Sequence, residues 1–446
     1  MHVFDLIPPA TVADEERRQL EFALRPAAMA GPLAAALRGA GEVPASGRPA
    51  CHILDVRYEP GARCTILYEV GKLLALGTLA WGAARERVAE AGNGIAPLGM
   101  RIHLFPDDPA MPGLAAAMRS EELITALTDA LPECYEGEWR IARARVTPVR
   151  YRPGRRCTLR LELWARHAAT GAPRSWTLFG KVYHSTEKAR AVFEHMRMLS
   201  EVAPPGAGRL VVARVAGFLP DLPMVLQEPL PGVALDLFLP LAAAGLTSVH
   251  ARTRSGVVMA ASALAELHRL DLTHPRQRSI DGELRRMADR GRAAAAIAPG
   301  LGARMADLAE TLSRSMERLS LEGREQRLVH ADCKPSQFLI GEMKVGLLDF
   351  DHAGMADPAL DVGAFMAALR QLACRRRASD MDSGMRGLER SFLDSYCDRA
   401  DVDADFRRRA VWYQAFALLQ KAQRAFARSI WSPVPGALLD EARRCL

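Results

Sequence analysis

The sequence predicts an α+β protein with a β-rich N-terminal part and a helical C-terminal part. Two similar hairpin patterns lie in residues 56–69 and 149–162, each with alternating apolar residues and a Pro-Gly turn. Apolar residues recur at helical spacing in residues 257–270 and 406–430. A third, shorter hairpin pattern in residues 338–348 separates these helical stretches. Strands grouped apart from helices are typical of the α+β class.

The composition bounds the class of protein. The chain has 446 residues, of which 49% are hydrophobic and 25% are charged, and its formal net charge is +7. These values are ordinary for a globular protein of two or three domains. Lysine and arginine are spread along the chain without a basic tail or a basic patch interleaved with aromatic residues. We therefore expect no nucleic-acid partner, since a phosphate-bearing small molecule explains local basic clusters better.

Cysteine usage and apolar runs predict the compartment. The eight cysteines form no Cys-x-x-Cys pair, and no histidine cluster has zinc spacing, so we expect reduced core thiols. The first ten residues lack a basic region followed by a long apolar segment, and no later apolar run is long enough to span a bilayer. These features predict a cytoplasmic protein with no membrane partner.

A fourteen-residue string occurs twice at an offset of 93 residues. Residues 56–69 read VRYEPGARCTILYE and residues 149–162 read VRYRPGRRCTLRLE, with nine identical positions. This identity indicates an internal duplication of a β-turn-β unit. The strand after the second copy carries Lys181, whereas the strand after the first has Thr78 in that place. Because threonine cannot neutralise phosphate, the second copy is predicted to be the working one and the first a degenerate copy.

The other elements follow from periodicity and breakers. Helical patterning in residues 12–37 is broken around Pro26 and Gly31. Lys181 lies mid-strand between apolar neighbours, so its ammonium needs an anionic partner. An apolar stripe through Trp412 predicts a core face. We expect a helix at 186–199, strands at 210–215 and 224–226, a proline-stiffened linker at 227–232, and helices at 257–270, 280–320, 362–375, 385–397 and 406–430.

A carboxylate lies just outside each strand of the hairpin in residues 338–348. Asp332 precedes the first strand and Asp349 ends the second, so pairing of the strands would bring both to the same end. One carboxylate could orient a hydroxyl group while the other holds a divalent cation, as in phosphoryl transfer. The alternative is that both are turn formers or helix caps, a common use of aspartate.

This segment resembles the catalytic segment of the aminoglycoside phosphotransferase and protein-kinase-like family, His-x-Asp-x-x-x-x-Asn followed by an Asp-Phe-Gly-type triplet. The first pattern is matched by His330, Asp332 and Gln337, and the triplet by residues 349–351. Residues 357–361 resemble the Asp-Pro-x-x-Asp run of the phosphotransferases. The resemblance covers roughly residues 140–440 and implies a two-lobe, protein-kinase-like fold that uses ATP and Mg²⁺.

The resemblance implies a role for each matched residue. Asp332 would be the catalytic base, and His330 and Asp361 would brace the loop. Asp349 would be the principal Mg²⁺ ligand. Gln337 would take the second metal-ligand position, where the family usually has Asn and where bacterial maltokinases carry Gln. Its amide oxygen is a suitable hard ligand, one methylene further out.

The same resemblance implies where ATP binds. Lys181 would align the α- and β-phosphates and pair with a glutamate of the following helix, either Glu187 or Glu194, of which we favour Glu194. The backbone amides of Glu228 and Leu230 would read the adenine edge, since the prolines of this linker have no N–H.

The turn in residues 152–156 takes the place of a phosphate-covering glycine loop, although it holds one glycine where protein kinases have three. Arg155 and Arg156 would then contact phosphate through their side chains, because a guanidinium forks well onto phosphate oxygens. Alternatively, the two arginines only interact with solvent at the hairpin tip. Arg63 favours this alternative, because the first copy keeps this arginine without an obvious nucleotide site.

The implied organisation has three parts: an N-terminal cap subdomain at 1–135 that partly duplicates the N-lobe, the N-lobe at 136–231, and a helical C-lobe at 232–446. We expect transfer of the γ-phosphoryl group of ATP to a hydroxyl group of a sugar, amino sugar or aminoglycoside-like small molecule. In that case Trp412, Tyr413 or Gln420 could meet the acceptor. Oligomeric state is left open.

Two alternative functions come from other classes. A catalytically weak, nucleotide-binding pseudokinase or scaffold is favoured by Gln337 and the glycine-poor turn, but the presence of Asp332, Asp349 and Lys181 speaks against it. A phosphatase that uses residues 349–351 is disfavoured, because no βαβ alternation follows them.

Overall fold

The computed structural model describes residues 14–38, 49–59, 62–81, 93–95, 98–131, 134, 136–203, 208–242, 247–295, 298–319, 326–376, 379–428 and 432–446. Packing divides the chain into two compact units. The first is Met1–Ala191 with Ala216–Gln227 and Ala427–Trp431, and the second is Val192–Val215 with Glu228–Phe426 and Ser432–Leu446.

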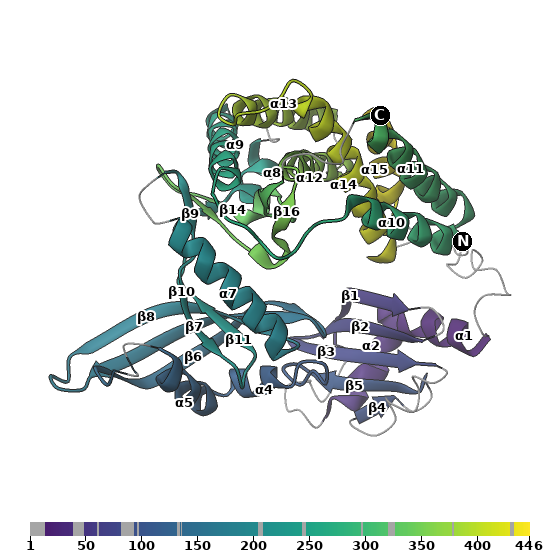
Figure 1. Ribbon diagram of the computed structural model, residues 1–446. Coiled ribbons are helices and arrows are strands. Elements are labelled where there is room, and N and C mark those ends of the chain that lie inside the picture. The colour runs from purple at the N-terminus through teal and green to yellow at the C-terminus, as the bar shows by residue number, and fades with distance from the viewer. Residues whose placement is uncertain are drawn as a thin grey trace. The chain divides into compact units, whose positions relative to one another are not determined.

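The first unit begins with two helices and an antiparallel sheet (Figure 1). Helices α1 (Asp14–Ala23) and α2 (Pro26–Ala36) are separated just before Pro26, as predicted, but the break expected at Gly31 is wrong, because α2 continues through it. The Tyr68 hydroxyl donates to the Ala23 carbonyl oxygen (2.7 Å) and ties α1 to the sheet. The sheet has the order β1-β2-β3-β5-β4, with β1 (Cys51–Glu59), β2 (Arg63–Val70), β3 (Leu73–Ala80), β4 (Asn93–Ile95) and β5 (Met100–Leu104).

A second sheet completes the first unit. Its order is β10-β11-β8-β7-β6, and the pairs β11–β8, β8–β7 and β7–β6 are antiparallel. Leu123 and Leu127 of helix α5 (Ser120–Ala130) pack in one buried core with Leu159, Leu161 and Leu163 of the sheet, beside α4 (Gly113–Met118). The strands are β6 (Trp139–Arg152), β7 (Arg156–His167), β8 (Pro173–Tyr183), β10 (Val215–Leu219) and β11 (Met224–Gln227).

Both copies of the repeated string form hairpins, β1–β2 and β6–β7. In the first sheet Thr65 pairs with Thr78. In the second, Thr158 pairs with Lys181. Since Thr65 and Thr158 are matched positions of the two strings, Thr78 and Lys181 occupy corresponding places in the two sheets. The Pro-Gly turn of the first copy lies outside the described residues.

The second unit is mainly helical and contains two small sheets (Figure 1). The expectation of a β-rich N-terminal region and a helical C-terminal region is therefore confirmed. The strand expected at 210–215 is wrong in one respect, because it is divided. Its first part, β9 (Leu210–Val212), runs parallel to β15 (Val345–Leu347). The Leu210 amide there donates to Glu266 Oε2 (2.8 Å), which holds β9 against the helices.

The elements of the second unit follow in chain order. The helices are α7 (Thr186–Val202, which begins in the first unit), α8 (Leu239–Ala242), α9 (Thr247–His268), α10 (Ile280–Ala295), α11 (Pro299–Arg318), α12 (Ala359–Arg376), α13 (Ser379–Cys397), α14 (Phe406–Arg428) and α15 (Val434–Arg444). The sheets are β12-β14-β15-β9 and β13-β16, with β12 (Val233–Ala234), β13 (Arg327–Val329), β14 (Phe338–Ile340), β15 (Val345–Leu347) and β16 (Gly354–Ala356).

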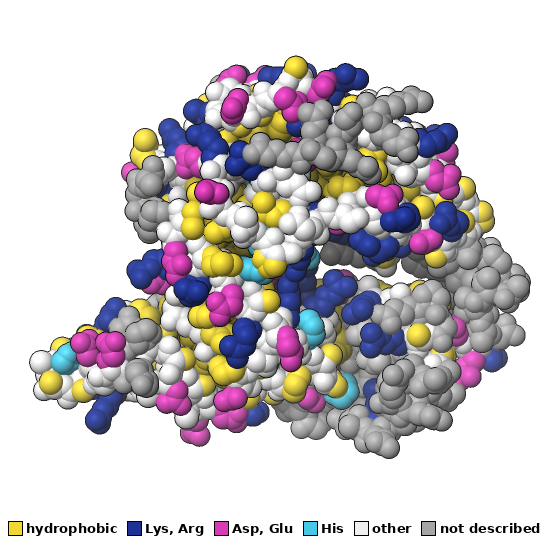
Figure 2. Space-filling model, viewed as in Figure 1, with side chains coloured by type: hydrophobic (Ala, Val, Ile, Leu, Met, Phe, Trp, Pro, Cys, Tyr) yellow, Lys and Arg dark blue, Asp and Glu magenta, His cyan; other side chains and the backbone are white. Residues whose placement is uncertain are grey.

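The helical unit has a mixed surface charge. Basic and acidic side chains are interspersed over its visible face in Figure 2, and many form pairs such as Arg407 with Asp394 (2.6 Å). In the part of the chain that the structure describes, no helix combines the length and apolar character needed to cross a membrane.

Candidate active site

The short hairpin brings the two predicted carboxylates to one end. Strands β14 and β15 pair antiparallel, with Phe338 opposite Leu347. Gln337 directly precedes β14, and its Nε2 lies 3.4 Å from Asp332 Oδ2 and 3.3 Å from Asp349 Oδ2. The carboxylates of Asp332 and Asp349 therefore both lie beside the side-chain amide of Gln337.

The backbone at this end is strained and well braced. Ala331 and Asp349 both have positive φ (58° and 71°), a region that L-residues avoid unless the surroundings impose it. Asp361 accepts hydrogen bonds from the His330 and Ala331 amides (2.6 and 2.8 Å). The His330 ring donates through Nε2 to the Leu348 carbonyl oxygen (2.7 Å), and its Nδ1 accepts from the Asp332 amide (3.2 Å). One imidazole thus fixes the two chain segments that carry Asp332 and Asp349.

Asp361 belongs to a buried network on the helices. His268 of α9 contacts Asp361 through Nε2 (3.1 Å), and its Nδ1 lies 2.6 Å from the Tyr396 hydroxyl. Burial opposes ionisation of Asp361, but the hydrogen bond and charge of His268 and the hydrogen bond from the His330 amide outweigh it, so its pKa lies below the ordinary value. The carboxylate is therefore charged at neutral pH. His268 lies 93 positions before Asp361, so the sequence carries no local signal of this contact.

Asp332 is held ionised by a neighbour that sequence reasoning missed. Burial would raise its pKa, but the charge of Lys334 and its hydrogen bond to Asp332 Oδ2 outweigh burial and hold the pKa below the ordinary value. A carboxylate of low pKa is a weak base, so it is better suited to orienting a hydroxyl proton than to removing it in advance. Lys334 follows Asp332 by two residues in the sequence, but the hydrogen bond between them forms only in the conformation that the loop adopts.

The donor set fits Mg²⁺ shared with a nucleotide. Magnesium is usually held by one or two protein carboxylates together with phosphate oxygens and water. Asp349 supplies such a carboxylate. Gln337 supplies a side-chain amide, and flipping this amide by 180° exchanges its nitrogen and oxygen, so that the oxygen then faces Asp349. In the ranges that the structure describes, no group of three or more His, Cys, Asp and Glu residues forms a complete cage.

The predicted nucleotide residues are distributed over both units. Lys181 is partly buried on β8, between its partners Thr158 and Val225 in the ladder. Glu194, its predicted partner, lies 3.6 Å from Arg197 of the same helix, and its side chain is 47% exposed.

The turn between β6 and β7 is anchored by Asp108, another residue that sequence reasoning missed. Asp108 is buried and accepts hydrogen bonds from the Gly154 amide (2.7 Å) and the Tyr151 hydroxyl (2.8 Å). Because the Gly154 and Arg155 amides are already hydrogen-bonded, the side chains of this turn are better placed than these amides to contact a phosphate. Arg155 is exposed, whereas Arg156 is buried.

One linker prediction is wrong. The Glu228 amide donates to the Arg214 carbonyl oxygen (2.9 Å), so this N–H does not read an adenine edge. The reason is tertiary: the chain segment before β10 runs beside the linker. Leu230 remains the candidate amide donor.

The aromatic residues of α14 belong to the core. Trp412 and Tyr413 are each 2% exposed, and Trp412 Nε1 donates to Ser315 Oγ (2.8 Å). Gln420 Nε2 donates to Glu283 Oε2 (3.0 Å). The apolar stripe is thus confirmed as a core face.

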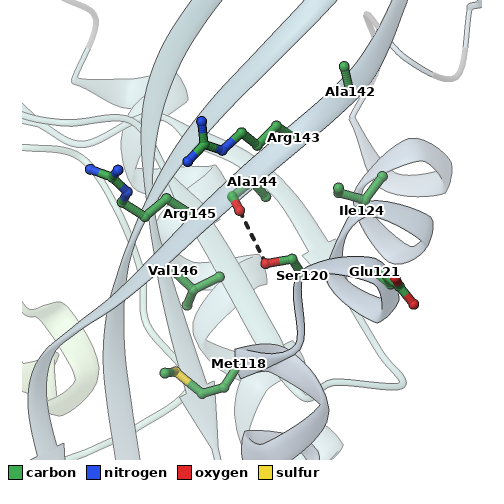
Figure 3. A pocket seen from close by; sticks show the side chains of 9 residues that line it. All are labelled: Met118, Ser120, Glu121, Ile124, Ala142, Arg143, Ala144, Arg145 and Val146. Atoms are coloured by element: carbon green, nitrogen blue, oxygen red, sulfur yellow. Dashed lines mark hydrogen bonds between the residues drawn. The ribbon is translucent and has the colours of Figure 1, made fainter.

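A separate hollow of about 540 Å³ lies in the first unit, against β6 and beside α4 and α5 (Figure 3). Ser120 points toward the strand and donates to the Ala144 carbonyl oxygen (3.1 Å), while Arg143 and Arg145 extend from β6. None of the predicted site residues lines this hollow.

Comparison with known proteins matches this site to one family. A family model described as the phosphotransferase enzyme family matches residues 164–412. No curated protein matches the chain. Three similar solved structures are a choline/ethanolamine kinase family protein from Mesorhizobium loti (14% identity, 73% of this chain and 93% of that chain, TM-score 0.44), a choline kinase from Cryptosporidium parvum Iowa II (10%, 73% and 94%, 0.46), and a macrolide 2′-phosphotransferase from Brachybacterium faecium (15%, 70% and 98%, 0.41).

Proposed function

We propose, because the chain belongs to the phosphotransferase enzyme family, that it transfers the γ-phosphoryl group of ATP to a hydroxyl group of a small molecule. The observation that carries the proposal is the convergence of Asp332, Gln337 and Asp349 at one end of a hairpin. Two carboxylates joined through one amide suit a reaction in which positioning and charge neutralisation supply most of the catalysis.

In this reaction Asp332 accepts a hydrogen bond from the acceptor hydroxyl and directs its oxygen at the γ-phosphorus. As the new O–P bond forms and the β–γ bridging bond breaks, the hydroxyl proton passes to Asp332 and ADP leaves. Asp349 and Gln337 would hold Mg²⁺, which would neutralise charge on the phosphates. His330 and Asp361 keep the two carboxylate-bearing segments in place.

For the nucleotide, the proposal keeps the residues that the family resemblance implies. Lys181 would align the α- and β-phosphates with Glu194 as its partner, and Arg155 and Arg156 would contact phosphate through their side chains. The Leu230 amide would contact adenine. Residues 1–135 would form the cap subdomain, 136–231 the N-lobe and 232–446 the helical C-lobe.

The first test is Asp332→Asn, which keeps the side-chain size but removes the charge. We expect turnover to fall by at least a hundredfold while ATP still binds, measured by ADP release and by calorimetric titration with ATP and Mg²⁺. Asp394→Asn is the matched control, because Asp394 is an exposed aspartate paired with Arg407. Full turnover in the Asp332 variant would rule out the proposed role.

The acceptor class is approached by screening sugars, amino sugars, aminoglycosides, amino alcohols and hydroxy acids, with ATP consumption as the readout. Phosphorylation of a hydroxyl group in any series supports the proposal. If no acceptor in the screen causes ATP to be consumed, and ATP is not hydrolysed with Mg²⁺ alone, the result would instead support a nucleotide-binding scaffold.

A further inference from the structure

A short stretch of chain between α9 and α10, residues 274–278, runs along strand β16. The Met355 amide donates to the Arg276 carbonyl oxygen (2.8 Å), and the Arg278 amide donates to the Met355 carbonyl oxygen (3.1 Å). Gln277 and Met355 form a parallel bridge. Residues 274–278, which we call the strap, therefore add a third edge to the small sheet of β13 and β16.

This small sheet carries both halves of the proposed active site. Strand β13 ends at Val329, three residues before Asp332, and β16 begins at Gly354, five residues after Asp349. Val329 and Gly354 are paired. A Cβ atom at Gly354 would lie 2.9 Å from the Arg276 carbonyl oxygen, so glycine permits the close approach of the strap. The strap thus packs against the segment that follows the proposed metal ligand.

The Arg276 side chain reaches the metal-binding segment itself. Its Nη1 donates to the carbonyl oxygens of Asp351 (3.1 Å) and Ala353 (3.4 Å). Both residues lie at the end of the 3₁₀ turn η6 (Phe350–His352), which begins directly after Asp349. The last carbonyl groups of a helical turn need partners from outside it, and here the residues that carry them are buried. The guanidinium supplies that partner.

Asp349 is held from both sides. Its φ of 71° is a conformation that an L-residue keeps only when its surroundings impose it. Before it, the His330 ring donates to the Leu348 carbonyl oxygen (2.7 Å). After it, Arg276 holds the carbonyl group of Asp351. The chain is therefore fixed one residue before and two residues after the proposed metal ligand.

The strap has supports of its own. His274 is buried, and its Nδ1 accepts a hydrogen bond from the Arg276 amide (3.0 Å). The centre of its ring lies 3.8 Å from that of His195 on α7. Arg278 Nη2 donates to Glu283 Oε1 of α10 (2.6 Å). Contacts with two helices thus fix the stretch from which the Arg276 guanidinium extends.

We infer that Arg276 is a positioning residue for the metal site: by holding the carbonyl groups of Asp351 and Ala353, it keeps the Asp349 carboxylate where it can bind Mg²⁺. The inference rests on the proposed function through the role of Asp349 as a metal ligand. Arg276 acts on the protein chain alone in this role. Its loss should therefore weaken metal binding and leave binding of the acceptor beside Asp332 unchanged.

Direct metal binding is the first readout, because it does not depend on turnover. Mn²⁺ is the probe, titrated into the full-length protein saturated with a non-hydrolysable ATP analogue and followed by electron paramagnetic resonance. Arg276→Met removes the donors, so we expect the Kd for Mn²⁺ to rise at least tenfold. Arg276→Lys keeps a cationic donor and should raise it less than threefold. Arg269→Met is the matched control and should not change it, because Arg269 also donates to a backbone carbonyl oxygen, that of Arg399 (2.6 Å), beyond the end of α13.

Turnover gives a second readout that a general loss of stability would not reproduce. In Arg276→Met, the Mg²⁺ concentration for half-maximal ADP release should rise at least tenfold, while KM for the acceptor stays within twofold. Hydrogen exchange gives a third readout, in the wild-type protein. Because coupling between two sites is reciprocal, Mg²⁺ with the ATP analogue should slow exchange of the Met355 amide at least fivefold relative to the analogue alone.

The outcomes separate this inference from the proposed function. If Arg276→Met binds Mn²⁺ as the wild type does, or if Mg²⁺ leaves exchange at Met355 unchanged, the inference is overturned while phosphoryl transfer stands. If the wild type binds Mn²⁺ but transfers no phosphoryl group, the proposed function fails, and the effect of Arg276→Met on Mn²⁺ binding still decides the inference. A wild type that binds no Mn²⁺ overturns both. If thermal melting shows that Arg276→Met does not fold, exchange in the wild type decides alone.

Discussion

Asp361→Asn tests whether the catalytic loop is held by a buried carboxylate. Asp361 is fully buried and accepts hydrogen bonds from the His330 and Ala331 amides, with His268 as a third partner. Asparagine has nearly the same shape but one acceptor oxygen, so one donor would face an N–H group instead. Each charge-assisted hydrogen bond contributes about 1.5–3 kcal/mol, and loss of a buried partner adds its desolvation cost. We expect the free energy of unfolding to fall by about 2–5 kcal/mol.

The pH dependence gives a second readout. Because the pKa of Asp361 lies below its ordinary value of 3.8, its ionised form stabilises the folded state at neutral pH, and this contribution is lost as pH falls through the folded-state pKa. The difference between wild type and Asp361→Asn should therefore be full at pH 7 and shrink below about pH 4. Turnover should also fall, since Ala331 is no longer held at positive φ beside Asp332.

Urea denaturation followed by circular dichroism measures the stability, and ADP release measures turnover. Asp394→Asn is the control, because Asp394 is 57% exposed and pairs only across the surface with Arg407 in the contacts described. A variant at position 361 as stable as wild type within about 0.5 kcal/mol would refute the reasoning, since surface substitutions commonly fall within that range.

Two further predictions concern residues away from the catalytic loop. Burial raises the pKa of Glu389 to about 7, despite Arg370 at 3.4 Å. The folded state should therefore lose on the order of 3 kcal/mol of stability as pH rises from 4.5 to 7. Glu389→Gln should remove this dependence of stability on pH. Unfolding free energies at pH 5 and pH 8 check this, and equal slopes in both proteins would contradict it. Asp108→Ala should lower the free energy of unfolding by about 1–3 kcal/mol and raise KM for ATP several-fold, because the Gly154 amide and Tyr151 hydroxyl lose their acceptor. An unchanged KM for ATP would show that this turn takes no part in nucleotide binding.

Local patterns sufficed wherever the relevant contacts are close in sequence. The hairpin of β14 and β15 is short, so two apolar runs and a turn predicted the pairing of its strands and the end of the hairpin at which Asp332 and Asp349 lie. The places of Lys181 and Thr78 in their ladders followed in the same way, because each strand pairs with the strand before it. Alternation in strands and apolar spacing in helices reflect backbone geometry, which does not depend on distant residues.

Packing between distant segments decided the rest. Asp361 reaches His330 across 31 positions, and Asp108 reaches Gly154 across 46. The sequence alone determined the fold class, the family resemblance and the residues at the hairpin. Only the tertiary structure showed that the Glu228 amide is occupied and that His268 of α9 contacts Asp361. The physical reason is that these contacts arise when buried faces of separate elements pack, and neither partner carries a local signal that identifies the other.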